Sequence, residues 1–232
     1  MKVTAVIVAA GGGLRIGGIV PKPYLPLAGR AMLLRTLDRV FGARTVEKVV
    51  LVIAASEWSR CEDMLRNDSA IGRRPWVLQS GGATRQQSVK AGLEKVDGNT
   101  DIVVIHDGAR PFASPALIER CIESAGRSGA VVVGLPALDT LKIVADDHRV
   151  LSTPDRKAMW KIQTPQAFRR ELIVEAHEWA THAGFEATDD ATLIEHMGKP
   201  VWVIDGEKTN LKITMAEDLW LAEAMIREGK IP

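Results

Sequence analysis

Four runs of consecutive apolar residues recur along this chain, with stretches of helical periodicity between them. The runs cover residues 3–9, 46–54, 102–105 and 130–135. A strand that is covered on both faces can be apolar throughout, so such runs are typical of buried parallel strands. We therefore expect an α/β protein, a Rossmann-like three-layer sandwich in which helices cover both faces of a mostly parallel sheet.

Apolar side chains at three- and four-residue spacing predict helices between these runs. The apolar stripes lie within residues 32–41, 89–96 and 117–122, and a last helix is expected from about 215 to 227. The third helix has a clear start, because Ser114 offers a capping hydroxyl and Pro115 suits the first helical position.

The stretch from about 137 to 161 interrupts this alternation. Residues 139–144 and 149–151 have strand character and flank an Asp146-Asp147 turn, which predicts a β-hairpin. Residues 160–163 would then return the chain to the main sheet. A hairpin inserted in an α/β protein is often an arm that meets another subunit. We expect one domain over residues 1–232 with a β-arm at about 137–161.

The composition excludes several classes of protein. With 30 basic and 29 acidic residues, the chain lacks the charge needed to wrap nucleic acid. No apolar run approaches the ~20 residues that span a membrane, and no targeting segment precedes the first strand pattern. Cys61 and Cys121 match no metal or redox spacing, which favours structural thiols in a reducing compartment. We expect a cytoplasmic protein without nucleic-acid or membrane partners.

The first apolar run leads directly into a glycine-rich turn with cations behind it. The residues concerned are Ala10, Gly11, Gly12, Gly13, Arg15 and Lys22. Glycines let backbone N–H groups approach an anion, and the two cations would face phosphate oxygens. Because open α/β sheets bind nucleotides at the carboxyl ends of their strands, this loop predicts a nucleoside triphosphate site.

Two common phosphate-binding loops do not fit this spacing. The dinucleotide fingerprint needs glycine where Ile16 stands, and the P-loop needs Lys and then Ser or Thr where Ile19 and Val20 stand. A plain turn from a strand to a helix is the alternative for this segment on its own.

A second glycine turn follows the short apolar run at 76–79 and opens a helix. Backbone amides at Gly81 and Gly82, with the hydroxyl of Ser88, could bind a base edge or a phosphate at the helix N-terminus. The alternative is an ordinary turn that is capped by Thr84.

Asp107 and Arg110 follow the strand at 102–105, at the mouth of the expected sheet. The carboxylate could face Mg²⁺ or a hydroxyl group, and the guanidinium could face phosphate oxygens. A surface ion pair between the two is the alternative. We expect His106 to be a packed residue at the strand end rather than a catalyst, because no partner of a catalytic triad is evident.

Three further polar segments are interpreted first as caps or solvated loops. They are Asp155-Arg156, Thr188-Asp189-Asp190 and Asn210-Leu211-Lys212. Asp189 and Asp190 lack a third metal ligand at a recognisable spacing, so a helix N-cap for residues 191–197 is favoured over a metal site.

Together these segments resemble the family of 2-C-methyl-D-erythritol 4-phosphate cytidylyltransferases of the non-mevalonate isoprenoid pathway. The matching motifs occur in order over nearly the full length: 9–15, 21–25, 81–82 with 85–89, 106–111, 139–142, 155–156, 163–166, 188–190 and 210–214. Pro23 and Gly108 depart from the residues common in relatives, and neither change removes a catalytic group.

The resemblance implies the nucleotidyltransferase form of the fold, similar to glycosyltransferase A, and a homodimer whose β-arms interlock. It implies that Arg15 and Lys22 stabilise the transition state on the phosphates of CTP, and that Arg156 and Lys212 position the methylerythritol phosphate. The residues implied in CTP binding are Ala10, Gly11, Gly12, Gly13, Gly81, Gly82, Arg85 and Ser88. Those implied in the substrate pocket are Asp107, Arg110, Thr140 and Thr188, with Asp107 as a ligand of Mg²⁺ and with Thr140 and Arg156 as candidates to serve the neighbour's site.

The implied reaction transfers CMP from CTP to the acceptor and releases pyrophosphate. A phosphate monoester has a second pKa of about 6 and is largely ionised at neutral pH, so no general base is needed. Cations and Mg²⁺ are needed to bring two polyanions together. Two other functions stay open at this point: a ribitol-5-phosphate cytidylyltransferase, and a non-catalytic nucleotide-binding regulatory protein.

Overall fold

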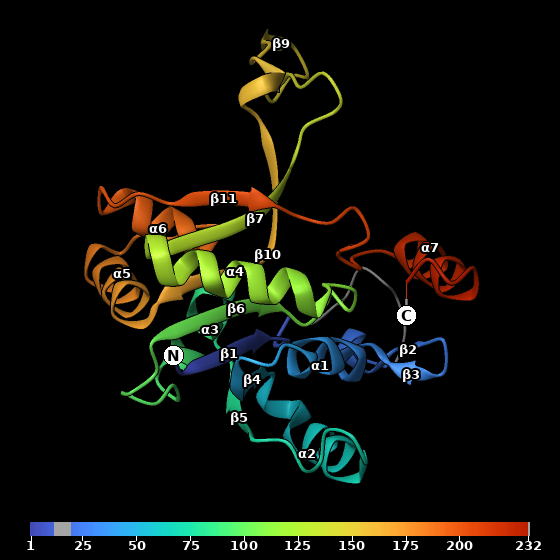
Figure 1. Ribbon diagram of the computed structural model, residues 1–232. Coiled ribbons are helices and arrows are strands. Elements are labelled where there is room, and N and C mark those ends of the chain that lie inside the picture. The colour runs from blue at the N-terminus through green and yellow to red at the C-terminus, as the bar shows by residue number, and fades with distance from the viewer. Residues whose placement is uncertain (12–19, 232) are drawn as a thin grey trace.

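A seven-stranded sheet forms the centre of the computed structural model, which describes residues 1–11 and 20–231 (Figure 1). The strand order is β11-β7-β10-β6-β1-β4-β5. In chain order these strands are β1 (Val3–Val8), β4 (Val46–Ile53), β5 (Trp76–Ser80), β6 (Ile102–Asp107), β7 (Ala130–Pro136), β10 (Trp160–Arg169) and β11 (Trp202–Asp205). The expected strands at all four apolar runs, and at 76–79, are confirmed.

β10 runs antiparallel to both of its neighbours, β6 and β7, whereas the other pairings of this sheet are parallel. The strand begins at the end of the inserted stretch, so residues 160–163 return the chain to the main sheet as expected. The sheet is therefore mostly parallel, as the apolar runs predict.

Helices cover both faces of the sheet, which confirms the three-layer architecture. One layer holds α1 (Met32–Gly42), α2 (Trp58–Asn67), preceded by the short helix η3 (Ala55–Glu57), and α4 (Pro115–Ser128). The other layer holds α3 (Arg85–Leu93), α5 (Arg170–Ala183) and α6 (Asp190–His196). Along β1, Ala5 and Ile7 pack against the first layer and Val6 packs against the second, because successive side chains of a strand point to opposite faces.

Three helices begin with side-chain caps, two of them predicted from the sequence and the third, Thr84, given there as an alternative. The hydroxyl of Ser114 accepts a hydrogen bond from the N–H of Leu117 at the start of α4. Thr84 caps α3 in the same way, and the carboxylate of Asp189 caps α6. Each cap satisfies a backbone N–H that the helix itself leaves without a partner.

A smaller apolar cluster lies at the N-terminal end of α1. There α7 (Ala216–Arg227) packs near the two-stranded sheet of β2 (Pro26–Leu27) and β3 (Arg30–Ala31). Leu27, Met32, Ile213 and Ala222 are buried in this cluster. The short helix η2 (Lys22–Tyr24) directly precedes β2, so the cluster supports the segment that carries Lys22.

Between β7 and β10 the chain forms an arm that stands clear of the rest of the molecule (Figure 1). It contains β8 (Ile143–Val144), β9 (Val150–Ser152) and the short helix η4 (Arg156–Ala158), and β8 pairs with β9 in an antiparallel hairpin. The hairpin is therefore present, with a shorter paired part than the sequence predicts. Its role in dimerisation stays a prediction.

Candidate active site

A cavity of ≈ 340 Å³ lies at the carboxyl ends of β1 and β6, in the size range of small-molecule sites. The chain crosses from β1 to β4 on one side of β1 and pairs β6 on its other side, so the cavity sits where the strand order reverses. Its walls come from the two glycine turns, from η2, and from the segments around Asp107 and Lys212. The lining residues are 8–11, 22–23, 32, 82–85, 88, 107–109 and 212.

Backbone hydrogen bonds fix the loops around this cavity to the strands beneath them. The N–H of Ala9 donates to the carbonyl of Val52 (2.7 Å), and the N–H of Gly81 donates to that of Ile53 (2.8 Å). On the other side of β1, Gly108 N–H donates to the carbonyl of Val8 (2.9 Å). The cavity floor is therefore an extension of the sheet.

Glycine is required at position 81 by close packing. A Cβ there would lie 2.5 Å from the Cβ of Ala10 and 2.7 Å from the hydroxyl oxygen of Ser88. The absence of a side chain thus lets the second glycine turn rest directly on the first.

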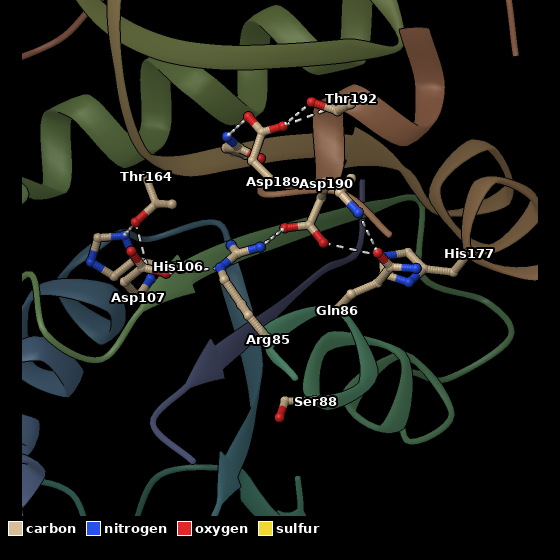
Figure 2. Close-up of polar contacts among 12 residues, drawn as sticks. Arg85, Gln86, Ser88, His106, Asp107, Thr164, His177, Asp189, Asp190 and Thr192 are labelled. Carbon is tan, nitrogen blue, oxygen red and sulfur yellow. Dashed lines mark hydrogen bonds and ion pairs between the residues drawn. The ribbon is translucent and has the colours of Figure 1, made fainter. Parts of the chain in front are cut away.

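The hydroxyl of Ser88 is used within its own loop. It donates to the carbonyl of Thr84 (2.9 Å) and accepts from the N–H of Gly82 (3.2 Å). Ser88 is almost fully buried and lies apart from the charged groups of the site (Figure 2). In this arrangement Ser88 shapes the loop backbone that faces the cavity.

Asp107 is surrounded by three cations. Its Oδ2 lies 2.8 Å from Nζ of Lys212 and 3.8 Å from Nε of Arg110, and its Oδ1 lies 3.3 Å from Nε of Arg85. Burial acts to raise the pKa of Asp107, but the charges of Arg85, Lys212 and Arg110 outweigh it and hold that pKa well below its ordinary range. The carboxylate is thus ionised, and the cluster carries a surplus of positive charge.

Arg85 extends this cluster into the interior. Figure 2 shows its guanidinium between two carboxylates, with Nη1 2.7 Å from Oδ2 of Asp190. The other oxygen of Asp190 lies 3.1 Å from Nε2 of His177 on α5. Arg85, at the start of α3, therefore ties the cavity to the α5–α6 layer.

His106 is a packed residue at the end of β6, as the sequence predicts. Its Nε2 lies 3.0 Å from the carbonyl of Arg110 and must donate, so Nδ1 accepts from the hydroxyl of Thr164. That hydroxyl accepts in turn from the N–H of Asp107. Burial lowers the pKa of His106 to about 4, so the ring is neutral at pH 7.

A second buried group, Asn210, organises the segment that carries Lys212. Its side-chain Nδ2 donates to the backbone carbonyl of Thr164 (2.8 Å), and its backbone carbonyl accepts from Nη1 of Arg110 (2.9 Å). The N–H of Ile213 donates to the carbonyl of Ala109. These bonds hold Lys212 against the loop that follows β6.

Most of the predicted site residues that lie within the described part of the chain come together in the structure. Those lining the cavity are Ala10, Gly11, Lys22, Gly82, Arg85, Ser88, Asp107 and Lys212. Gly81 and Arg110 adjoin it through the contacts given above. Gly12, Gly13 and Arg15 lie outside the described residues.

Besides Gly81 and Arg110, three described residues predicted for the site do not line the cavity of this chain. Thr140 and Arg156 are exposed on the arm, where Nη1 of Arg156 donates to the carbonyl of Leu138 (2.8 Å). Thr188 is exposed just before the Asp189 cap. Their roles stay predictions.

Sequence reasoning missed the supporting roles of Thr164, His177 and Asn210. Thr164 contacts Asp107 from 57 positions away, and Asn210 contacts Arg110 from 100 positions away. His177 reaches the site only through Asp190, 13 positions along the chain, and no local spacing reveals these contacts. Asp190 carried one usable signal: it follows the Asp189 cap directly, and one cap does not need two carboxylates.

The donor set does not fit a resident Mg²⁺. Both oxygens of Asp107 are engaged by cations, so neither is placed as a carboxylate ligand of Mg²⁺. Among residues 1–11 and 20–231, no three His, Cys, Asp or Glu side chains lie together as a metal site.

Comparison with known proteins decides the family. Residues 3–228 match the family model described as IspD, 2-C-methyl-D-erythritol 4-phosphate cytidylyltransferase. The chain belongs to this cytidylyltransferase family. It is accordingly an enzyme, a nucleotidyltransferase, and the resemblance drawn from the motifs is confirmed.

Individual relatives of this cytidylyltransferase agree. Proteins with the same family name from Syntrophotalea carbinolica and Desulforamulus reducens are 43% and 40% identical to it. The alignments cover 97% of this chain with each, and 97% and 96% of the two relatives. The crystal structure of 4-diphosphocytidyl-2C-methyl-D-erythritol synthase from Anaerococcus prevotii is 35% identical, with a TM-score of 0.86 over 97% of this chain and 98% of that one. No helix in the described part of the chain is long and apolar enough to cross a membrane.

Proposed function

We propose that this cytidylyltransferase transfers CMP from CTP to 2-C-methyl-D-erythritol 4-phosphate, and that it releases pyrophosphate and 4-diphosphocytidyl-2-C-methyl-D-erythritol for isoprenoid synthesis. The observation that carries this proposal is the cation cluster around Asp107, which opens into a cavity walled by two glycine turns. Such a site suits two phosphorylated substrates that must approach each other.

The chemistry demands charge neutralisation rather than proton transfer. The acceptor phosphate is already ionised near neutral pH, and His106 is neutral and fully buried, so it is no candidate base. Cations fixed near the reacting phosphorus stabilise the charge that builds up as the acceptor oxygen attacks and pyrophosphate leaves. Lys22 and Arg15 are proposed for this role.

The other residues divide between the two substrates. We propose that the backbone at 10–13 and at 81–82 holds CTP, and that Lys212 binds the acceptor phosphate together with Arg110. The side chain of Lys212 is 43% exposed, so its ammonium can move from Asp107 toward an incoming phosphate. Thr188 stays a proposed pocket residue on the acceptor side.

The arm is proposed to join two chains in a homodimer. Leu138, Ile143, Val150 and Leu151 expose more than half of their apolar surface there, and exposed apolar patches mark interaction sites. Thr140 and Arg156 lie on the same arm, outside the cavity of their own chain. We propose that they complete the site of the partner.

Mg²⁺ is proposed to enter as a counter-ion of the CTP phosphates rather than as a metal held by Asp107. Hard divalent ions in phosphoryl-transfer sites are commonly carried by substrate phosphates, which agrees with the engaged state of Asp107. A cytoplasmic location is proposed as well, supported by two buried free thiols, Cys61 and Cys121.

The two alternatives have less support. The relatives named above carry the methylerythritol phosphate name, and no feature of the structure favours ribitol 5-phosphate. A regulatory nucleotide-binding protein is not favoured because the chain belongs to an enzyme family.

The direct test is pyrophosphate release from CTP and Mg²⁺ with each polyol phosphate as acceptor. Turnover with methylerythritol phosphate and little with ribitol 5-phosphate is expected. The opposite preference would replace the proposal.

Lys22→Ala should lower kcat at least ~10²-fold, the scale of losing one group that stabilises transition-state charge. Lys199→Ala is the matched control, because Lys199 is an exposed lysine that does not line the cavity. Near-normal turnover of Lys22→Ala with an unchanged melting temperature would contradict the assigned role.

A further inference from the structure

A series of contacts between ionisable groups runs from the interior of the molecule to the cavity mouth. It begins at the imidazole of His177 and passes through the carboxylate of Asp190, the guanidinium of Arg85 and the carboxylate of Asp107 to the ammonium of Lys212. The successive contacts measure 3.1, 2.7, 3.3 and 2.8 Å. Figure 2 shows the inner four groups in this order.

Exposure is lowest at the inner end of this series of contacts and highest at its outer end. The side chains of Asp190 and His177 are 1% and 2% exposed, Asp107 is 10% exposed, Arg85 is 26% exposed and Lys212 is 43% exposed. A carboxylate as deeply buried as Asp190 is costly unless it is paired. Burial acts to raise its pKa, but the charge of Arg85 and the hydrogen bond from His177 hold that pKa below the ordinary range.

Within residues 1–11 and 20–231, Nδ1 of His177 has no hydrogen-bond partner. The contact of Nε2 with Asp190 is the hydrogen bond described for this ring. Asp190 is not the cap of α6, since Asp189 fills that position. Neither side chain is explained by the needs of its own helix.

Arg85 is held between the two carboxylates. Its Nε and Nη1 point in different directions, one to Asp107 and one to Asp190, and the rigid guanidinium fork fixes the separation of these two groups. A side chain held in this way is suited to position Asp107 rather than to bind a nucleotide.

We propose that Asp190 and His177 are positioning residues that fix Arg85, and that through Arg85 and Asp107 they set the location of the Lys212 ammonium at the cavity mouth. The inference rests on the proposed function in one respect, that Lys212 receives the acceptor phosphate. A substitution of Asp190 should therefore weaken binding of the acceptor phosphate and leave binding of CTP unchanged.

The test uses Asp190→Asn, which keeps the shape of the side chain and removes its charge. We expect the KM for methylerythritol phosphate at saturating CTP to rise about tenfold, the effect of weakening one charge-assisted hydrogen bond. The dissociation constant for CTP, measured by titration without acceptor, should change less than about twofold. His177→Phe should act in the same direction more weakly.

Two comparisons separate positioning from simple loss of stability. Thr192→Val weakens the same helix, because the hydroxyl of Thr192 bonds the Asp189 cap. Its melting temperature should fall about as far as that of Asp190→Asn, whereas the KM for methylerythritol phosphate and the dissociation constant for CTP should stay unchanged. In a Lys212→Ala background, Asp190→Asn should add almost nothing, since residues that act through one another are not additive.

Crystal structures of the parent protein and of Asp190→Asn complete the test. Arg85 and Lys212 are expected to be displaced in the variant, and unchanged positions of both would overturn the inference even if the protein used another acceptor. A lower melting temperature with unchanged KM would also overturn it, and so would an equal loss of CTP affinity. Absence of turnover by the parent protein would instead refute the proposed function.

Discussion

His106 and Asp107 are consecutive residues of β6, and both have a lowered pKa for opposite reasons. Burial disfavours the charged form of His106, whereas three cations outweigh burial and favour the charged form of Asp107. The pair shows how one strand end separates two tasks. The neutral imidazole joins Thr164 to the carbonyl of Arg110, and the ionised carboxylate gathers the cations of the cavity.

The pKa of His106 predicts a pH dependence of stability. The folded value of about 4 lies below the unfolded value of about 6.5, so the unfolded state takes up the proton first as the pH falls. The free energy of unfolding should have its full value above pH 6.5. It should decline by up to about 3 kcal/mol as the pH falls toward 4.

Urea unfolding between pH 4.5 and 7.5 measures this effect. His106→Gln should show a shallower pH slope than the parent protein, whatever its absolute stability. His182→Gln, at an exposed position of α5, should keep the parent slope. Equal slopes for all three proteins would contradict the prediction.

Elements with strong local signals could be predicted from the sequence. The buried parallel strands and the caps Thr84, Ser114 and Asp189 depend on a few adjacent residues, so pattern and composition suffice to find them. By contrast, α2 buries only Cys61 and Leu65, and β11 is a four-residue edge strand. Such elements are stabilised mainly by neighbours that are distant in the chain, and sequence analysis did not find them.

The same division applies to the site. Glycine turns and strand-end charges stand out in the sequence because each lies next to a strand. The contacts of Arg85 with Asp190, and of Asn210 with Thr164, join segments 105 and 46 residues apart. They exist only once the sheet has formed.

The contact between the two glycine turns can be tested with Gly81→Ala. A Cβ at this position would lie 2.5 Å from that of Ala10, which cannot move without the end of β1. We expect a loss of about 1–3 kcal/mol in stability, the usual cost of overpacking, together with weaker CTP binding.

Gly98→Ala is the control, because a Cβ there would meet no atom within 4 Å. Its unfolding midpoint and CTP affinity should match those of the parent protein. Wild-type affinity and stability in Gly81→Ala would show that the turns can separate freely.

At the scale of the whole molecule, the arm divides the proposed site residues between two groups. Lys22 and Lys212 line the cavity, whereas Thr140 and Arg156 lie on the arm and outside it. The proposed site shared between two chains would account for both groups, and the arm stands clear of its own body (Figure 1).

Mixing two inactive variants tests this sharing. A heterodimer of Lys22→Ala and Arg156→Ala would have one site with both defects and one site with none, if Arg156 serves the partner. Activity should therefore return on mixing, toward half of the parent value per heterodimer. If Arg156 serves its own chain, each site keeps one defect and mixing restores nothing.

The attachment of the arm also has a practical consequence. Pro136 at the end of β7 and Trp160 at the start of β10 are register partners in an antiparallel pair. Without the residues inserted between them, these two strands would form an ordinary β-hairpin. A two-residue turn can close such a pair. Excision of residues 137–159 should therefore remove the arm alone and leave every strand of the main sheet intact.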